Sequence, residues 1–153
     1  MRIFPWQRKQ KFFDEEESTL IVNAIKQAEQ RTNGEVRVFV ESKCSWMDAI
    51  DRAHELFFKL GMQQTENRNA SLVYVAIKDR QLAVFGDEGI HRKVGDAYWN
   101  SVVTDMLSHF NKDNYAQGIA DSVLKIGEAL ATHFPFDRQT DINELPDEIV
   151  FGR

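Results

Sequence analysis

Apolar residues recur along the chain at two spacings, and these spacings separate the predicted helices from the predicted strands. Where they fall three or four positions apart, they form one apolar face of a helix. This spacing holds over residues 14–31, 47–60, 94–110 and 115–130. Shorter runs, in which β-branched and other apolar residues follow one another, are typical of strands buried in a sheet. Such runs occupy residues 36–40, 72–77 and 82–85.

The order of these elements predicts the architecture of the sheet. The strand–helix–strand unit from Val36 to Ile77 has the length of a right-handed crossover, so its two strands should be parallel. A short turn at 78–81 then returns the chain as an antiparallel third strand. Helices at four places in the chain can cover both faces of the sheet. We therefore predict an α/β fold, a three-layer α/β/α sandwich with a small mixed β-sheet.

The length of 153 residues fits one domain with two short arms. A chain of this size buries roughly 68–70% of its unfolded surface and needs no disulfide or metal to fold. Residues 1–13 hold four basic groups and no acid, and we expect a flexible basic arm. The domain should span residues 14–136, beginning with a capping box from Asp14 to Glu17. Residues 137–153 alternate acidic and apolar positions and predict an arm that packs on the domain.

Composition narrows the classes of function. The formal net charge of -5 and the pI of about 5.4 disfavour a nucleic-acid-binding protein, whose domains usually carry a basic face. No stretch approaches the roughly 18 apolar residues of a membrane-spanning helix. The single cysteine, Cys44, and the missing apolar core of a signal peptide favour a cytoplasmic protein. We expect a monomer, and a protein partner remains open.

The predicted chain direction brings three polar loops to one edge of the sheet. The first two strands begin there and the third strand ends there, so residues 32–35, 65–69 and 86–89 should converge. Carboxylate and amide oxygens of Glu35, Asn69, Asp87 and Glu88 are hard ligands suited to calcium or magnesium. The sequence therefore predicts a divalent-cation site at this edge.

Further residues border these oxygens. Gly86 and Gly89 flank the acidic pair, and we expect them to let backbone carbonyls turn inward as additional ligands. Arg68 and His91 stand at the edge of the same loops. A structural interpretation also fits, in which Asp87 and Asn69 cap loops and the start of the third helix while Arg68 pairs with an acid.

Most familiar catalytic motifs are missing from the sequence. The four histidines are scattered, and none has a cysteine or acid partner at zinc-binding spacing. No glycine-rich phosphate loop is present. The residue six positions after Cys44 is Ile50, where a cysteine phosphatase needs arginine. Cys44 is therefore predicted to be a small buried thiol.

Several runs together resemble the TPM domain family. They are Ile25 to Val38 (IKQAEQRTNGEVRV), Leu60 to Val75 (LGMQQTENRNASLVYV), Ala83 to Val94 (AVFGDEGIHRKV) with Trp99 after it, and His133 to Val150. The resemblance implies an α/β/α domain and, in some members, calcium or a similar ion in acidic loops. It matches best at Gly86-Asp87 and Arg68-Asn69 and less well at Glu35. The family also carries a phosphatase label.

Three functions follow as hypotheses. The first is a divalent-metal-binding interaction domain acting in protein quality control or assembly. The second is a metal-dependent phosphatase for phosphate monoesters, with His91 as proton carrier. The third is a scaffold whose C-terminal arm binds the partner. The residues themselves give the phosphatase no support beyond the family label.

Overall fold

The computed structural model describes residues 12–136 and 148–152. Over these residues the chain forms four α-helices, one short 3₁₀ helix and four strands. In chain order they are α1 (Glu15–Glu29), β1 (Glu35–Glu41), α2 (Ala49–Lys59), η2 (Met62–Gln64), β2 (Ala70–Ala76), β3 (Gln81–Gly86), α3 (Glu88–Phe110), α4 (Tyr115–His133) and β4 (Val150–Phe151).

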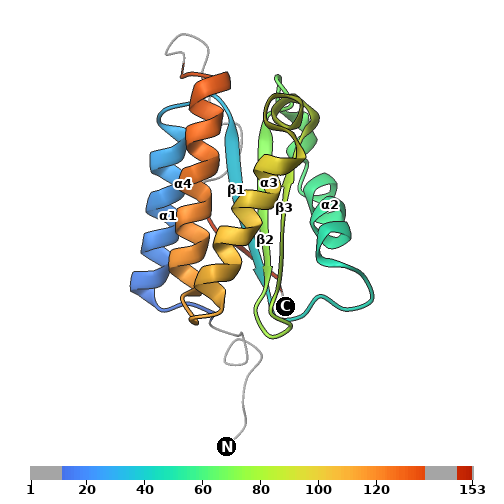
Figure 1. Cartoon of the computed structure of the whole chain (residues 1–153), viewed down its shortest axis with the longest axis vertical. Coiled ribbons are helices and arrows are strands. Elements are labelled where there is room, and N and C mark those ends of the chain that lie inside the picture. Colours follow the sequence, from blue (N-terminus) through green and yellow to red (C-terminus); the bar gives the residue numbers. More distant parts are fainter. Residues whose placement is uncertain (1–11, 137–147, 153) are drawn as a thin grey trace, which may run out of the picture.

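The strands form one mixed sheet in the order β3-β2-β1-β4. β1 is parallel to β2 and to the short β4, whereas β2 and β3 are antiparallel (Figure 1). The predicted parallel pair and the hairpin after it are therefore confirmed. β4 is an addition to the three predicted strands and lies beside Phe39 and Val40 of β1.

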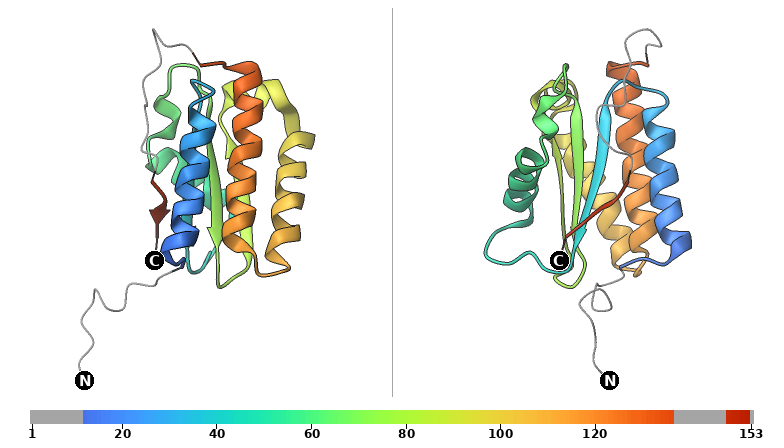
Figure 2. Two further views of the ribbon diagram at one scale, coloured as in Figure 1. Left: turned by 90° about the vertical axis from the view of Figure 1, so that its left-hand side faces the viewer. Right: turned by 180° about the vertical axis from the view of Figure 1, so that it is seen from behind.

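Helices cover both faces of the sheet, which confirms the three-layer α/β/α prediction. α1, α3 and α4 lie on one face and α2 lies on the other (Figures 1 and 2). Successive residues of β2 alternate between the two hydrophobic cores, Val73 facing one and Tyr74 the other. Every residue of β1 and β2 is buried, as expected for strands covered on both sides.

Two helix features bear directly on the sequence predictions. The capping box is confirmed, since the Glu17 backbone N–H donates to Asp14 at 2.8 Å and the Asp14 N–H donates to Glu17 at 3.1 Å. α3 is longer than its predicted apolar stripe and bends at Gly95, whose φ is 77°. Glycine adopts this left-handed conformation without the steric cost that other residues incur.

The ends of the chain are described only in part, so the division into two arms and a domain stays a prediction. Residues 1–11, 137–147 and 153 lie outside the described residues. Phe12, placed in the arm by the sequence, stacks on Phe151 at a ring separation of 6.0 Å. Phe13 is buried in the larger core. Within the described ranges, no helix has both the length and the apolar character to cross a membrane.

Candidate functional site

The three polar loops meet at one edge of the sheet, as the predicted chain direction requires. The Glu35 N–H faces the Asn69 carbonyl at 3.4 Å, and the Asp87 N–H donates to the Ala70 carbonyl at 2.9 Å. The Gly89 N–H donates to the Arg68 carbonyl at 2.8 Å. Backbone hydrogen bonds thus join three loops, of which the first (32–35) and the last (86–89) are more than fifty positions apart in the sequence.

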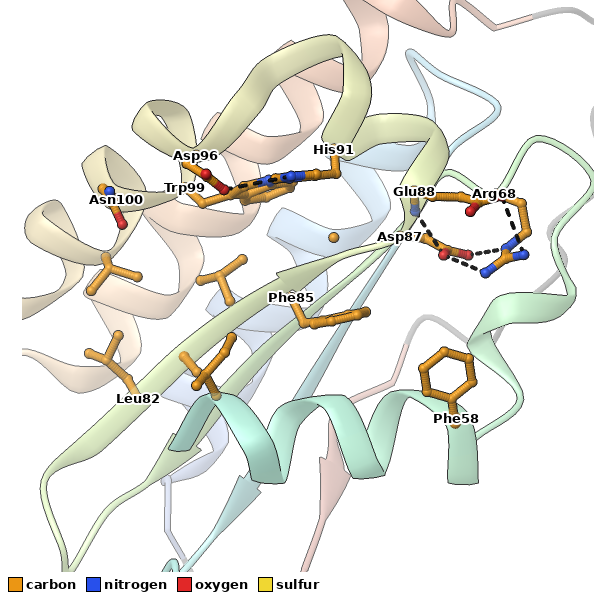
Figure 3. A pocket seen from close by; sticks show the side chains of 15 residues that line it. Phe58, Arg68, Leu82, Phe85, Asp87, Glu88, His91, Asp96, Trp99 and Asn100 are labelled. Carbon is orange, nitrogen blue, oxygen red and sulfur yellow. Dashed lines mark hydrogen bonds and ion pairs between the residues drawn. The ribbon is translucent and has the colours of Figure 1, made fainter. Parts of the chain in front are cut away.

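Asp87 is the structural centre of this edge. Its carboxylate accepts two hydrogen bonds from the Arg68 guanidinium, at 2.6 and 2.8 Å (Figure 3). It also accepts the Glu88 backbone N–H at 2.8 Å and so caps α3. The hydrogen bonds that Arg68 donates to the Asp87 carboxylate raise the pKa of the Arg68 guanidinium. These contacts match the structural interpretation that the sequence left open.

Asn69 lies deep beneath the same loops and is 1% exposed. Its side-chain amide nitrogen donates to the Asn33 side chain at 2.8 Å. Its side-chain oxygen is buried and has no hydrogen-bond partner among the residues that the structure describes. Glu35 is also buried, and its charge acts on Arg37, whose pKa is lowered by burial and raised in part by Glu148, Glu29 and Glu35.

Glu88 faces solvent, with 54% of its side chain exposed, and lies 3.6 Å from Arg68 and 3.5 Å from Arg92. The four predicted ligands therefore do not form a ready cluster, because Asp87 is held by Arg68 and Glu88 points outward. Across residues 12–136 and 148–152, no group of three or more His, Cys, Asp or Glu side chains is arranged to hold a metal. Cation binding here stays a prediction.

Gly86 and Gly89 have a packing role that the sequence did not predict, and whether their carbonyls bind an ion stays a prediction. Neither has a positive φ, so neither turns a carbonyl through a left-handed conformation. A Cβ on Gly86 would lie 2.2 Å from the Trp99 ring, and one on Gly89 would lie 2.1 Å from the Asn67 carbonyl oxygen. Both positions need glycine because another group packs directly against the backbone.

His91 is held between Trp99 and Asp96. Its Nδ1 accepts the indole N–H of Trp99 at 3.0 Å, and its Nε2 lies 3.6 Å from Asp96. The indole N–H of tryptophan can only donate, so Nδ1 of His91 is the acceptor of this hydrogen bond. His91 therefore orients the indole that packs on Gly86.

An open groove of about 790 Å³ extends from this edge along β3. α2 contributes Ile50 and Phe58 to one wall, α3 contributes Trp99 to the other, and β3 forms the floor (Figure 3). The sequence pattern did not predict this groove. Ile50, one of the apolar residues of the helix predicted over residues 47–60, is 49% exposed. One available signal was the run Gln81–Gly86, which contains no charged residue.

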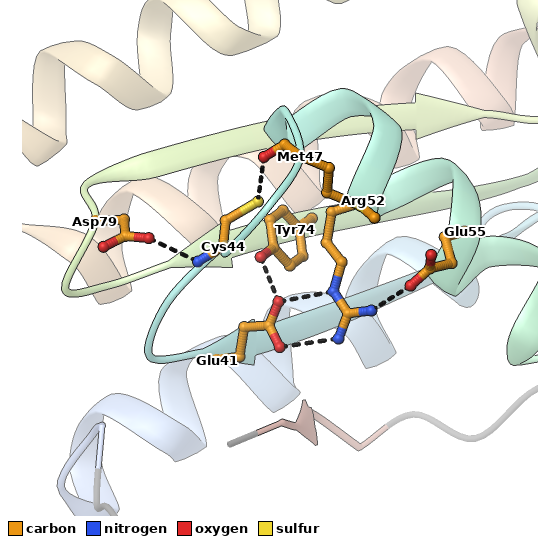
Figure 4. A network of polar contacts seen from close by, with 7 residues as sticks. All are labelled: Glu41, Cys44, Met47, Arg52, Glu55, Tyr74 and Asp79. Atoms are coloured by element: carbon orange, nitrogen blue, oxygen red, sulfur yellow. Dashed lines mark hydrogen bonds and ion pairs between the residues drawn. The ribbon is translucent and has the colours of Figure 1, made fainter.

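A second polar network, also missed, lies at the opposite end of the parallel strands (Figure 4). Arg52 donates to both carboxylate oxygens of Glu41, at 2.9 and 3.0 Å, and the Tyr74 hydroxyl donates to the same carboxylate. Burial, followed by the hydrogen bond to Glu41, raises the pKa of Tyr74. Cys44 lies beside this network and is a buried free thiol, as predicted.

Comparisons with known proteins place this architecture in a family. The profile of the TPM domain matches residues 7–129. The structure of BA42 from the psychrophilic bacterium Bizionia argentinensis superposes with a TM-score of 0.86 at 38% identity, covering 95% of this chain and 99% of BA42. The N-terminal domain of cg2496 from Corynebacterium glutamicum shares the fold, with a TM-score of 0.63 at 14% identity over 78% of this chain and 74% of that one. No curated protein is similar enough in sequence to count as a match. The chain belongs to the TPM domain family.

Proposed function

We propose that this TPM domain is an interaction domain whose loop edge binds a divalent cation, calcium or magnesium, in competition with the Arg68–Asp87 ion pair. The proposal rests on the buried side-chain oxygen of Asn69, which lacks a hydrogen-bond partner among the described residues at the place where three loops meet. A buried oxygen without a partner costs free energy that a ligand can recover. Such a domain would serve assembly or quality control by holding a partner protein in an ion-dependent way.

Competition follows from the charges. The Arg68 guanidinium occupies the carboxylate that a cation would need, and it supplies the positive charge that the buried Asp87 requires. The Arg68 side chain is 37% exposed, so solvent can receive it if an ion replaces it. Asp87, Glu88 and Asn69 would then supply oxygens, which are the ligands that calcium and magnesium prefer.

The experiment is a thermal melt with calcium or magnesium, paired with an amide NMR titration. A ligand that binds the folded state alone adds about 2.7 kcal/mol at a concentration of 100 times its Kd. We expect the ion to raise the melting temperature of the wild type in a saturable way. This rise should disappear in Asp87→Asn and should be larger in Arg68→Gln. Asp96→Asn is the matched control, because it removes an exposed carboxylate from the groove without touching the three loops.

Two results would contradict the proposal. One is an unchanged melting temperature in both Arg68→Gln and the wild type up to millimolar ion. The other is a response that Asp96→Asn reduces as much as Asp87→Asn does, because general screening of acidic groups would then explain it.

Phosphatase activity is the alternative function, and one residue in the groove bears on it. The half-exposed His91 directs Nε2 toward Asp96. A phosphoryl group bound to a cation at Asp87 and Glu88 would lie in the groove that His91 also lines. The test is hydrolysis of p-nitrophenyl phosphate by His91→Gln, with His109→Gln as the control. Equal rates in both variants and the wild type would point to a contaminating enzyme.

A further inference from the structure

β3 lies at the edge of the sheet that residues 12–136 and 148–152 form, and half of its backbone groups point away from β2. The Asp87 N–H donates to the Ala70 carbonyl, which marks this pair as a hydrogen-bonded pair of the antiparallel ladder. Such pairs alternate with non-bonded pairs along the strands. The N–H and C=O groups of Leu82, Val84 and Gly86 therefore face outward, along the floor of the groove.

This edge lacks the devices that usually prevent a strand from pairing with another chain. Edge strands are commonly protected by charged side chains, proline or a bulge. Residues 81–86 contain no charge and no proline, and their register with β2 runs without interruption from Gln81 to Gly86. The opposite edge of the sheet differs, because its outer strand is the two-residue β4, which pairs with Phe39 and Val40 of β1. A very short edge strand is one of the protective devices.

The two walls of the groove suit the alternating side chains of a strand. On the α2 side, Ile50 and Phe58 are 49% and 41% exposed, large values for apolar residues. On the α3 side, Trp99 and Val103 line the groove (Figure 3). Because successive side chains of a strand point to opposite faces, a strand laid beside β3 would place them alternately against these walls.

The shape and charge of the groove select the occupant. A second copy of this chain does not fit, because its β3 is also flanked by α2 and α3. Two copies paired through β3 would therefore bring the α2 and α3 helices of both copies into the same space. An extended peptide has no such obstacle. The charged residues that line the groove are Arg68, Asp87, Glu88 and Asp96, a net negative set that favours a basic partner. Asp96 is the most accessible of them, with 90% of its side chain exposed.

We propose that the free edge of β3 binds an extended segment of a partner protein as an added strand. The segment carries apolar residues at alternate positions and a lysine or arginine that faces Asp96. Backbone hydrogen bonds to Leu82, Val84 and Gly86 supply affinity, and the two walls supply selectivity. The inference is independent of the proposed cation, since none of these contacts needs an ion.

The test begins with a library of random heptapeptides displayed on phage and selected against the full chain in EDTA, which removes the ion. We expect enrichment of peptides that alternate apolar residues and include a basic one. A synthetic copy of the best peptide should slow amide hydrogen exchange at Leu82, Val84 and Gly86 by about tenfold or more, because those N–H groups become hydrogen-bonded. Exchange at Ala83 and Phe85, already bonded to β2, should change less.

Three matched changes separate strand addition from other modes of binding. Leu82→Pro removes an outward N–H that β2 does not use, and should weaken binding about tenfold while leaving the ladder intact. The same peptide with N-methylated amides on one edge should bind as weakly, and this control needs no change in the protein. Asp96→Asn should weaken binding about threefold, the size expected for an exposed ion pair.

Two results would contradict the addition of a strand to β3. An absence of enriched peptides overturns the proposal. So does a peptide that binds equally well after N-methylation and leaves the three amides unprotected, because it then docks through side chains alone. A peptide that binds in EDTA while calcium and magnesium leave the melting temperature unchanged would support the edge and contradict the cation proposal separately.

Discussion

The two ends of the sheet each hold an arginine bonded through two hydrogen bonds to a carboxylate, but the surroundings differ. At one end, Arg52 and Glu41 are 23% and 7% exposed by side chain, and the Tyr74 hydroxyl joins them. At the other, Asp87 is buried while Arg68 is 37% exposed and lies at the mouth of the groove. The same kind of arginine–carboxylate ion pair is thus enclosed at one end of the sheet and accessible to solvent at the other.

The difference shows how burial separates a structural pair from an exchangeable one. Removing one partner of an enclosed pair leaves a charge in a medium of low polarity, which is costly. At the accessible end, water can take over the contacts of Arg68. The comparison predicts that the Glu41 network contributes mainly to stability, whereas the Asp87 edge can exchange its partner. Four variants, taken from the largest expected effect to the smallest, test this prediction.

Glu41→Gln should give the largest loss of stability. It leaves the Arg52 guanidinium without its buried counter-charge, and we expect the free energy of unfolding to fall by about 3 kcal/mol. Denaturant unfolding followed by circular dichroism measures it. The double variant Glu41→Leu with Arg52→Met removes both charges and should recover much of the loss. Equal losses in the single and double variants would show that the ion pair itself is not what matters.

Tyr74→Phe should cost less, about 1–2 kcal/mol, because Glu41 keeps its bonds to Arg52. It should also change the pH dependence. The pKa of Tyr74 is raised in the folded state, so its contribution is intact below the unfolded pKa of about 10 and is lost as pH rises above that value. The melting temperature of the wild type should therefore fall more steeply above pH 10 than that of Tyr74→Phe. Parallel curves would contradict this role.

Much of the fold was predictable because it depends on local pattern and chain direction. The β-branched runs fixed the central strands, and the length of the crossover between them fixed their parallel pairing. Asp14 was correctly predicted as a cap because the capping box is a short-range interaction. The meeting of the loops near Asn69 and Asp87 followed from the same topology.

The chemistry of the site was less predictable, for a physical reason. A carboxylate suits a guanidinium and a metal ion equally well, so the identity of Asp87 does not reveal that Arg68 holds it. The exposure of Ile50 depends on α2 being the one α-helix that the described residues place on its face of the sheet, and no pattern within the helix encodes this. β4 was missed because two residues carry too little periodicity to be recognised.

Asp87→Ala should lower the free energy of unfolding by about 1 kcal/mol, through loss of the cap on α3. Asp48→Ala is a matched control, since Asp48 occupies the same position before α2 but its side chain makes no capping hydrogen bond. We expect almost no change in that variant by the same unfolding measurement. A loss as large as that of Glu41→Gln would mean that the Asp87 edge is as structural as the enclosed end.

Ile50→Ser should have the smallest effect on stability and a large effect on the proposed binding. Replacing a half-exposed apolar residue outside the core usually changes the free energy of unfolding by less than about 0.5 kcal/mol. Because Ile50 lines the groove, its loss should weaken binding of the selected peptide by about tenfold, as for other central apolar contacts. Leu20→Ser is the control, since Leu20 is 39% exposed on α1 and does not line the groove. If Leu20→Ser weakens peptide binding as much as Ile50→Ser does, binding depends on general surface hydrophobicity and not on the groove. The Asp87 edge would then show no binding role that separates it from the Glu41 network.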